Sequence, residues 1–316
     1  MSKKSGVFTI GTDTELFLQR KSDGKFISAI PFIEGTKHDP TILKSKTGNI
    51  QHDNVSVEFA TNPTTSKPTK TKKSFVDMIH TTLNDVIDYL PKEYDLSIMA
   101  STDFDKSELK TKEAQLFGCD PDFNAWSVAM NKIPQIEGLT FRSCGGHIHV
   151  GFVKNSGNDF LLDFEGKLNT IKMMDCFHGI VSVILDSSKS SARRKELYGK
   201  AGAHRPKEYG IEYRVLSNYW LKSPELVMLM ESLTKDVLVL IRKKSHIKIL
   251  KTIDNIASTI NNNDIKEAQI ILDSITKYMS KNSLFYLDMA LEKIDNYNFK
   301  NEWKLGEVSK TKHIKI

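Results

Sequence analysis

The sequence predicts an α+β fold with a mainly antiparallel sheet, helices packed outside it and a helical C-terminal region. Two observations carry this prediction. Strand-like segments in the first two thirds of the chain are joined by loops that show no helical pattern. Helical patterns are grouped between and after those strands, whereas strands that alternate regularly with helices would predict a parallel sheet.

The composition is typical of a globular protein that buries its own core. The 316 residues are 39% hydrophobic and 27% charged, which excludes a disordered or collagen-like chain. No run approaches 18 consecutive apolar residues, so we expect no transmembrane span and no membrane partner. The basic N-terminus lacks an apolar signal core and a small-residue cleavage site, so we expect a cytoplasmic location (the host cytoplasm if the chain is phage-encoded).

Charge and cysteine content narrow the function classes further. Three widely spaced cysteines without a CxxC motif predict neither a disulfide framework nor a thiolate zinc site. The net charge of +6 comes from 45 basic and 39 acidic residues, and part of the excess lies in the lysines after residue 303. A solvated, lysine-rich surface explains this excess, so a nucleic-acid partner is not expected.

Alternating and apolar segments predict the strands, which are separated by polar loops. A glycine-, lysine- and proline-rich loop spans 31–48, a linker spans 61–73, and a loop-like stretch spans 102–131. The predicted strands are 7–10, 14–19, 26–28, 54–60, 96–100, 147–152 and 209–218.

Capping signals predict the helices. Ser74 is a candidate N-cap for an amphipathic helix that ends before Pro91, and a longer helix is expected over 159–185. Ser223, followed by proline and glutamate, starts a helix that runs to about residue 244. Two or three further helices are expected over 247–297, so we divide the chain into a catalytic domain, 1–245, and a helical region with a basic tail, 246–316.

Four of the predicted strand segments each carry polar groups that are spaced to point the same way. Side chains two positions apart on a strand lie on one face of a sheet. If these strands share a sheet, one face therefore collects all of these groups. They are Asp13 and Glu15, Glu58, His147 and His149, and Glu212 and Arg214.

Carboxylates and imidazoles crowded on one face predict a metal site. The set is rich in oxygen, has few nitrogens and no thiolate, which favours Mg²⁺ or Mn²⁺ over zinc. The alternative is an ordinary water-facing sheet surface, which also carries charged side chains. Against it, Glu58 and Glu212 are flanked by apolar residues, and glycines lie beside several of the other groups. Like charges gathered there would repel one another without a cation.

A basic, glycine-containing segment at 193–207 precedes the Glu212 strand and is predicted to be a loop. Its Lys200 and Arg205, together with Arg214, are candidates for holding a phosphate or carboxylate. An exposed basic loop is the alternative. A P-loop motif, GxxxxGK[ST], is absent from the sequence, so a nucleotide is not expected to be held in that way.

These elements together resemble the amidoligases with the glutamine synthetase and glutamate–cysteine ligase fold, and more narrowly the phage-type COOH·NH2 ligases. The resemblance rests on four short motifs in the family's order, which span residues 11–217: GTDTE at 11–15, the 53–58 segment followed by TNP at 61–63, GHIH at 146–149, and EYR at 212–214.

The resemblance implies a cupped antiparallel sheet that binds ATP and two or three Mg²⁺ ions. It implies that Asp13, Glu15, Glu58, His147 and Glu212 are metal ligands, with Asp53 as a candidate further ligand. Arg214 would face the transferred phosphate, with Arg205 and Lys200 assisting, and His149 would lie near the nucleotide. Asp13 stands where many relatives have glutamate, and the chain beyond residue 224 matches no pattern that we can name.

The implied function is an ATP-dependent ligase that joins a carboxylate and an amine through an acyl phosphate, releasing ADP and phosphate. Two alternatives remain: a metal-dependent hydrolase that uses His147, His149 and the acids, and a non-catalytic nucleic-acid- or protein-binding module. The substrates could be small molecules or peptides that carry a carboxylate and an amine. Oligomer formation is possible, and the sequence does not specify it.

Overall fold

The computed structural model describes residues 6–67, 73–115, 122–132, 134, 138–294 and 296–305. In these residues the chain forms one large antiparallel sheet with helices packed on it, which confirms the α+β class with a mainly antiparallel sheet. The more specific expectation of a glutamine synthetase-like cup stays a prediction.

The sheet contains twelve of the described strands, and every recorded pairing within it is antiparallel. The main order is β10-β9-β13-β14-β12-β1-β5-β4-β3, and β2, β6 and β7 also pair with β1. The bounds are β1 Phe8–Arg20, β2 Phe26–Ile27, β3 Thr41–Ile42, β4 Gly48–Asp53, β5 Ser56–Thr61, β6 Thr64–Thr65, β7 Tyr94–Ser97, β9 Phe123–Asn124, β10 Ala129–Met130, β12 Gly146–Phe152, β13 Ala203–Lys207 and β14 Gly210–Tyr213. A separate pair is formed by β8 (Ser101–Asp103) and β11 (Phe141–Ser143).

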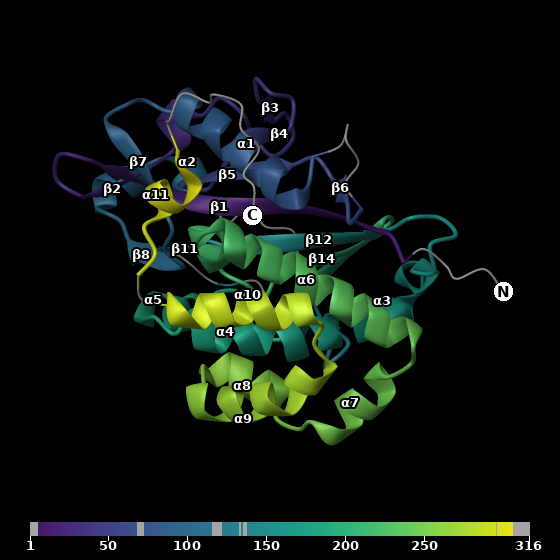
Figure 1. The fold of residues 1–316 in the computed structure, drawn as a ribbon. Helices are drawn as coiled ribbons and strands as arrows, with labels where there is room; N and C mark the ends of the chain where they lie inside the picture. The colour runs from purple at the N-terminus through teal and green to yellow at the C-terminus, as the bar shows by residue number, and fades with distance from the viewer. Residues whose placement is uncertain are drawn as a thin grey trace.

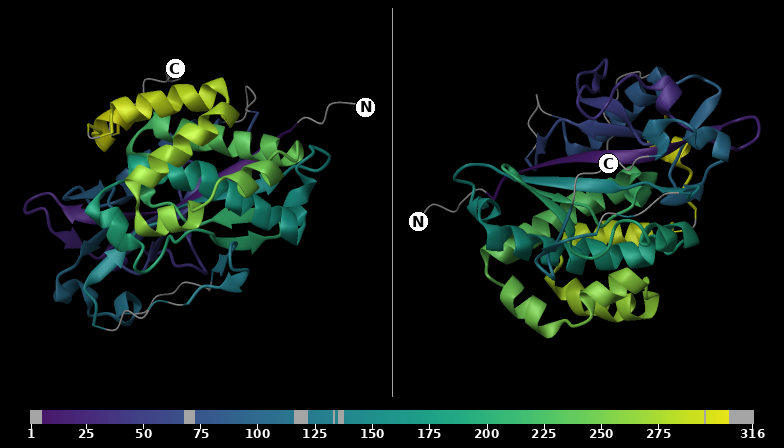
Figure 2. Two further views of the ribbon diagram at one scale, coloured as in Figure 1. Left: turned by 90° about the horizontal axis from the view of Figure 1, so that it is seen from below. Right: turned by 180° about the vertical axis from the view of Figure 1, so that it is seen from behind.

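Helices α4, α6, α8, α9 and α10 form layers on one side of the central strands. Figure 1 shows α6 beneath β12 and β14, with α4 and α10 below it and α8 and α9 farther from the sheet. The view from behind shows the same layering (Figure 2). The bounds are α1 Phe75–Tyr89, α2 Lys112–Gln115, α3 Phe164–Met174, α4 Ile180–Leu185, α5 Lys189–Arg194, α6 Pro224–Arg242, α7 His246–Thr252, α8 Ile256–Asn262, α9 Ile265–Ile275, α10 Lys281–Glu292 and α11 Phe299–Trp303.

The two faces of β1 have different chemistry because its side chains alternate. Ile10 and Leu16 belong to the main hydrophobic core, which also holds the helices. Asp13 and Glu15 point to the other face. That face becomes apolar again at Phe17, which joins a second, smaller cluster with Val55 and Cys144. A polar region of the sheet therefore lies beside a small apolar wall.

Two helix predictions are confirmed. The Ser74 hydroxyl caps α1 by accepting a hydrogen bond from the amide of Asp77. The Ser223 side chain caps α6 in the same way, with Pro224 at the first helical position.

Several predicted bounds differ from the structure. The segments 7–10 and 14–19 form the single strand β1. Of the segment 96–100, only residues 96 and 97 are in a strand, at the end of β7, and β8 begins at Ser101. The helix expected over 159–185 is interrupted, because a short 3₁₀ helix precedes α3 and a π-helical turn at Asp175–Gly179 separates α3 from α4. The last strand ends at Tyr213 rather than at residue 218.

The basic segment at 193–207 is a loop only in its middle part, 195–202. It contains the end of α5 and strand β13, which pairs with β14. Glycines and Pro206 suggested a loop, since proline weakens a strand prediction. The structure accommodates Pro206 because β9 pairs with β13 only at Ala203 and His204, so Pro206 lies at an exposed edge.

Where two or three helices were expected over 247–297, the described residues form four α-helices, α7 to α10, between 246 and 292. Their apolar residues belong to the same core cluster as the sheet. The division at residue 245 stays a prediction. Cys119, the lysines at 310, 312 and 315, and residues 68–72 of the expected linker lie outside the described residues.

One segment, residues 164–185, is long and apolar enough to span a membrane by length and composition. Of its most apolar window, 83% is buried inside the protein, as in a core helix. The predicted cytoplasmic location stays a prediction.

Candidate active site

Strand register brings the predicted polar groups to one face of the sheet. Directly opposite partners in antiparallel strands point to the same side. Glu15 on β1 lies opposite Glu58 on β5, and Asp13 lies opposite His147 on β12. His149 on β12 lies opposite Glu212 on β14. The prediction that these strands share a sheet, with their polar groups on one face, is therefore confirmed.

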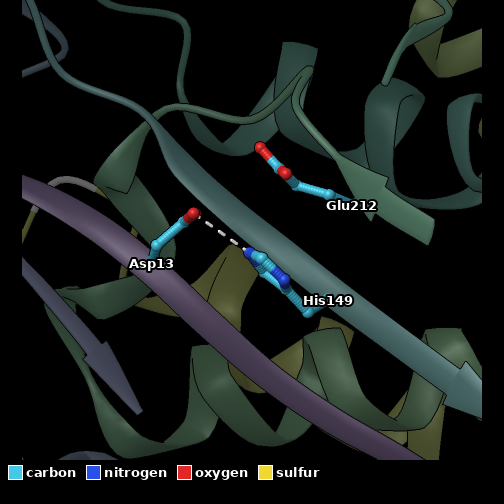
Figure 3. A group of neighbouring side chains, drawn as sticks. All are labelled: Asp13, His149 and Glu212. Carbon is cyan, nitrogen blue, oxygen red and sulfur yellow. Dashed lines mark ion pairs between the residues drawn. The ribbon is translucent and has the colours of Figure 1, made fainter. Parts of the chain in front are cut away.

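The first group on this face consists of Asp13, His149 and Glu212. One potential ligand atom from each lies within 4.8 Å of the others. Figure 3 shows them projecting from three adjacent strands, with the ion pair between His149 Nε2 and Asp13 Oδ2 at 3.1 Å. Two carboxylates and one imidazole thus meet at a single point.

The second group consists of Glu15, Asp53 and Glu58, whose carboxylate oxygens also lie within 4.8 Å of one another. Asp53 reaches it from the end of β4, where the β4–β5 hairpin turns. The amide of Gly145 donates a hydrogen bond of 2.7 Å to Glu15, and the side chain of Gln51 donates one of 3.0 Å to Glu58. The structure therefore places Asp53, whose spacing matched no family pattern, directly with the other acids.

His147 belongs to neither group but connects with the first. Its Nδ1 lies 2.8 Å from Asp13 Oδ1 and 4.0 Å from Glu212 Oε1. The ring is buried. A Cβ atom at Gly145 would lie 2.4 Å from His147 Nε2, so this position has to be glycine for the ring to stay where it is. Its role as a metal ligand stays a prediction.

Three basic side chains surround the carboxylate of Glu212, which has no solvent exposure. Arg214, which directly follows β14, donates to Oε1 of Glu212. Arg205 Nη1 lies 3.3 Å from the same oxygen, and Lys207 Nζ lies 2.8 Å from Oε2. Lys200 is exposed in the turn before β13, and the recorded ion pairs of this cluster involve Lys207 in its place.

The sequence reasoning missed three residues at this site. Lys207 follows Arg205 at the same two-residue spacing that marked the other strands, but the segment was interpreted as a loop. The hydroxyl of Tyr209 and Nδ1 of His149 share a hydrogen bond of 2.5 Å. Asp122 Oδ2 lies 3.4 Å from Arg214 Nε. Nothing in the local sequence around Tyr209 or Asp122 indicated these contacts.

Charges within the first group are balanced. Burial alone would raise the pKa of Asp13, but the imidazoles of His149 and His147 lower it well below its usual value. Burial and the Asp13 carboxylate also oppose ionisation of Glu212, yet Arg214 and the two imidazoles lower its pKa to about 2. Both carboxylates are therefore ionised near neutral pH.

The second group lacks this balance. Burial, followed by repulsion from Asp53, raises the pKa of Glu15 to about 8. Burial and then Asp13, Asp53 and Glu15 raise the pKa of Glu58 well above its usual value, and burial raises that of Asp53. Three half-buried carboxylates without a neutralising cation disfavour ionisation of one another.

This donor chemistry fits hard divalent cations. The second group offers only carboxylate oxygens, the ligands that Mg²⁺ and Mn²⁺ prefer. The repulsion within the group is what a bound cation would relieve. The first group adds one imidazole nitrogen, a ligand that is less common than oxygen in Mg²⁺ and Mn²⁺ sites.

One comparison with known proteins matches part of this chain to a ligase family. Residues 139–256 match the family described as phage phiEco32-like COOH.NH2 ligase-type 2. The matched segment contains six of the predicted site residues: His147, His149, Lys200, Arg205, Glu212 and Arg214. This finding supports the expectation of a carboxylate–amine ligase at that general level.

A crystal structure of a bifunctional glutathione synthetase from Pasteurella multocida aligns with 95% of this chain and 48% of that chain, at 11% sequence identity and a TM-score of 0.48. The chain thus spans about half the length of that protein. No curated protein is similar enough to match it.

Proposed function

We propose that this chain is an ATP-dependent carboxylate–amine ligase that requires Mg²⁺ or Mn²⁺ and forms an amide through an acyl-phosphate intermediate. One observation carries the proposal: a single sheet face holds two groups of metal-ligand type, flanked by Arg205, Lys207 and Arg214. The family match supports the same reaction class.

The chemistry of amide formation accounts for these residue types. A carboxylate has to attack the γ-phosphate of ATP although both are anions, and the resulting acyl phosphate then reacts with the amine. Divalent cations held by the two groups would screen the phosphates and stabilise charge on the transferring group. The reaction requires no protein nucleophile, which agrees with Cys144 and Cys176 being buried.

The basic side chains would bind the phosphates directly. Arg214 and Arg205 offer planar guanidinium forks that match phosphate oxygens, and Lys207 offers a point charge. All three now contact Glu212, so a bound phosphate would compete with that carboxylate for them. Tyr209 would keep the His149 ring oriented through its hydrogen bond.

The direct test is ATP binding measured by calorimetry with Mg²⁺ and, separately, with EDTA. We expect Mg²⁺-dependent binding to the wild-type protein and its loss in Glu58→Ala, because Glu58 belongs to the all-carboxylate group. Glu292→Ala is the matched control, since Glu292 is an exposed acid at the end of α10.

The outcomes separate the function classes. Metal-dependent binding that Glu58→Ala abolishes and Glu292→Ala retains would support the ligase and justify a search for substrates by ADP release. A folded wild-type protein that binds no ATP in either buffer would contradict the proposal. The metal-dependent hydrolase would then be tested by amide and phosphoester turnover without ATP.

A further inference from the structure

A cavity opens beside the second acid group, on the same face of the sheet. It is partly open to solvent. Glu15 and Asp53 line one part of it, and three arginines, Arg142, Arg194 and Arg214, also line it.

Two of the three arginines already form hydrogen bonds or ion pairs with other residues of the chain. Arg142 Nε donates to the side chain of Asn54 at 2.9 Å, and its other nitrogens donate to backbone carbonyls, including that of Ala114 at 2.8 Å. Arg214 is paired with Glu212 and Asp122. Their charges or hydrogen-bonding groups thus have partners within the chain.

Arg194 differs from both because one of its buried donors has no hydrogen-bond partner and no carboxylate of the described residues forms an ion pair with its guanidinium. Only 2% of the residue is exposed. Its Nη1 donates to the carbonyl of Val215 at 2.9 Å, and Nη2 donates to that of Arg214 at 3.4 Å. Nε is buried and has no hydrogen-bond partner in the described part of the chain. A buried charge without a counter-ion is costly, and a bound anion would remove that cost.

The backbone is shaped to hold this arginine in place. Gly199 has φ +78°, a conformation that glycine adopts readily. A Cβ atom there would lie 1.8 Å from Arg194 Nη1 and 2.8 Å from the carbonyl oxygen of Val215. Only glycine at this position therefore leaves room for the guanidinium.

We infer that this cavity is the binding pocket for a small carboxylic acid, such as an amino acid, with Arg194 pairing with its carboxylate. The inference rests on the proposed ligase function, which requires a carboxylate substrate beside the phosphate site. Hydroxyl groups of Ser56, Ser143 and Tyr198 also line the pocket and supply polar neighbours for the ligand. A carboxylate fits better than a phosphate, because Glu15 and Asp53 in the same wall repel a dianion more strongly than a monoanion.

The test follows the Nε–H group of Arg194 by NMR in the full chain, in Mg²⁺-containing and in EDTA buffer. Through-bond experiments and the loss of the signal in Arg194→Lys assign the resonance. Acetate is the probe, and chloride at equal ionic strength and inorganic phosphate are the comparisons. We expect a saturable downfield shift of the Nε–H proton with acetate in at least one buffer, because a hydrogen bond to a carboxylate forms.

Thermal stabilisation by acetate gives a second readout that does not depend on this resonance. It should be lost in Arg194→Lys and retained in Arg193→Lys, since Arg193 is the neighbouring arginine of α5 and pairs on the surface with Asp103. No shift and no stabilisation with acetate in either buffer would overturn the inference, and a response to phosphate alone would overturn the assignment to a carboxylate.

This result is independent of ATP binding. A protein that binds Mg²⁺-ATP but gives no acetate response would contradict the pocket alone. A protein that responds to acetate but binds no ATP would retain a carboxylate site and contradict the ligase.

Discussion

Arg205 and Glu212 lie directly opposite one another on β13 and β14, with Nη1 of the arginine 3.3 Å from Oε1 of the glutamate. Lys207 and Arg214 contact the same carboxylate. Glu212 is thus the counter-ion of three cations as well as a candidate metal ligand, and these two roles have different consequences for stability.

Glu212→Gln is expected to destabilise the metal-free protein as well as to abolish ATP turnover. The substitution leaves the buried guanidinium of Arg214 without its main partner, which costs roughly 3 kcal/mol. Chemical denaturation in EDTA measures the change in the free energy of unfolding. Glu208→Gln is the control, since Glu208 is exposed in the turn of the same hairpin. Equal stability of the two variants would show that the ion-pair cluster is not structural.

Glu58→Gln is expected to have the opposite effect on the metal-free protein. It removes one of three mutually repelling half-buried carboxylates, and the amide can still accept the hydrogen bond from Gln51. The melting temperature in EDTA should therefore rise, whereas the stabilisation that Mg²⁺ gives the wild-type protein should disappear. A variant that is less stable in EDTA, or that Mg²⁺ still stabilises fully, would contradict the assignment of Glu58 to a cation site.

Gly199→Ala is expected to lower the free energy of unfolding by more than its left-handed backbone conformation alone would. Gly138 provides the matched control, because it has nearly the same φ, +77°, and no atom within 4 Å of an added Cβ. The left-handed conformation costs about 1–2 kcal/mol in either alanine variant. The further loss in Gly199→Ala reflects displacement of Arg194, and urea denaturation of both variants measures it. Acetate stabilisation should also be lost only in Gly199→Ala.

Protonation of His178 is expected to contribute to unfolding in mild acid. The ring lies in the π-helical turn without solvent exposure, and Nε2 donates to the carbonyl of Met230 at 3.1 Å. Burial lowers its pKa from 6.5 to about 4. The unfolded state therefore binds more protons between these values, so the free energy of unfolding falls as the pH falls through them, by up to about 3 kcal/mol.

The variant His178→Gln should lack this component of the pH dependence. His38→Gln, which changes an exposed histidine, should retain it. Denaturant titrations at several pH values between 4 and 7 compare the three proteins. Parallel curves for the wild-type protein and His178→Gln would exclude His178 as the group that titrates.

Much of the candidate site follows from local strand geometry. Asp13 with Glu15, His147 with His149, and Glu212 with Arg214 are two positions apart, and a strand places such pairs on one face whatever surrounds it. The helix starts at Ser74 and Ser223 are likewise local, because a side-chain cap satisfies amide groups within the next few residues. The sequence by itself therefore determined these residue pairs and these helix starts.

The tertiary structure decided which side chains of other strands lie beside each of these pairs. Register across strands far apart in the chain placed Glu15 beside Glu58 and His149 beside Glu212, and no local preference sets that register. Lys207 became part of the site because β13 pairs with β14 despite Pro206. Arg194 became a buried cation without an ion-pair partner because the carbonyls of Arg214 and Val215 bind its guanidinium and Gly199 leaves space for it. Long-range pairing and burial create these properties, because the charge balance of a site depends on every group that packs against it.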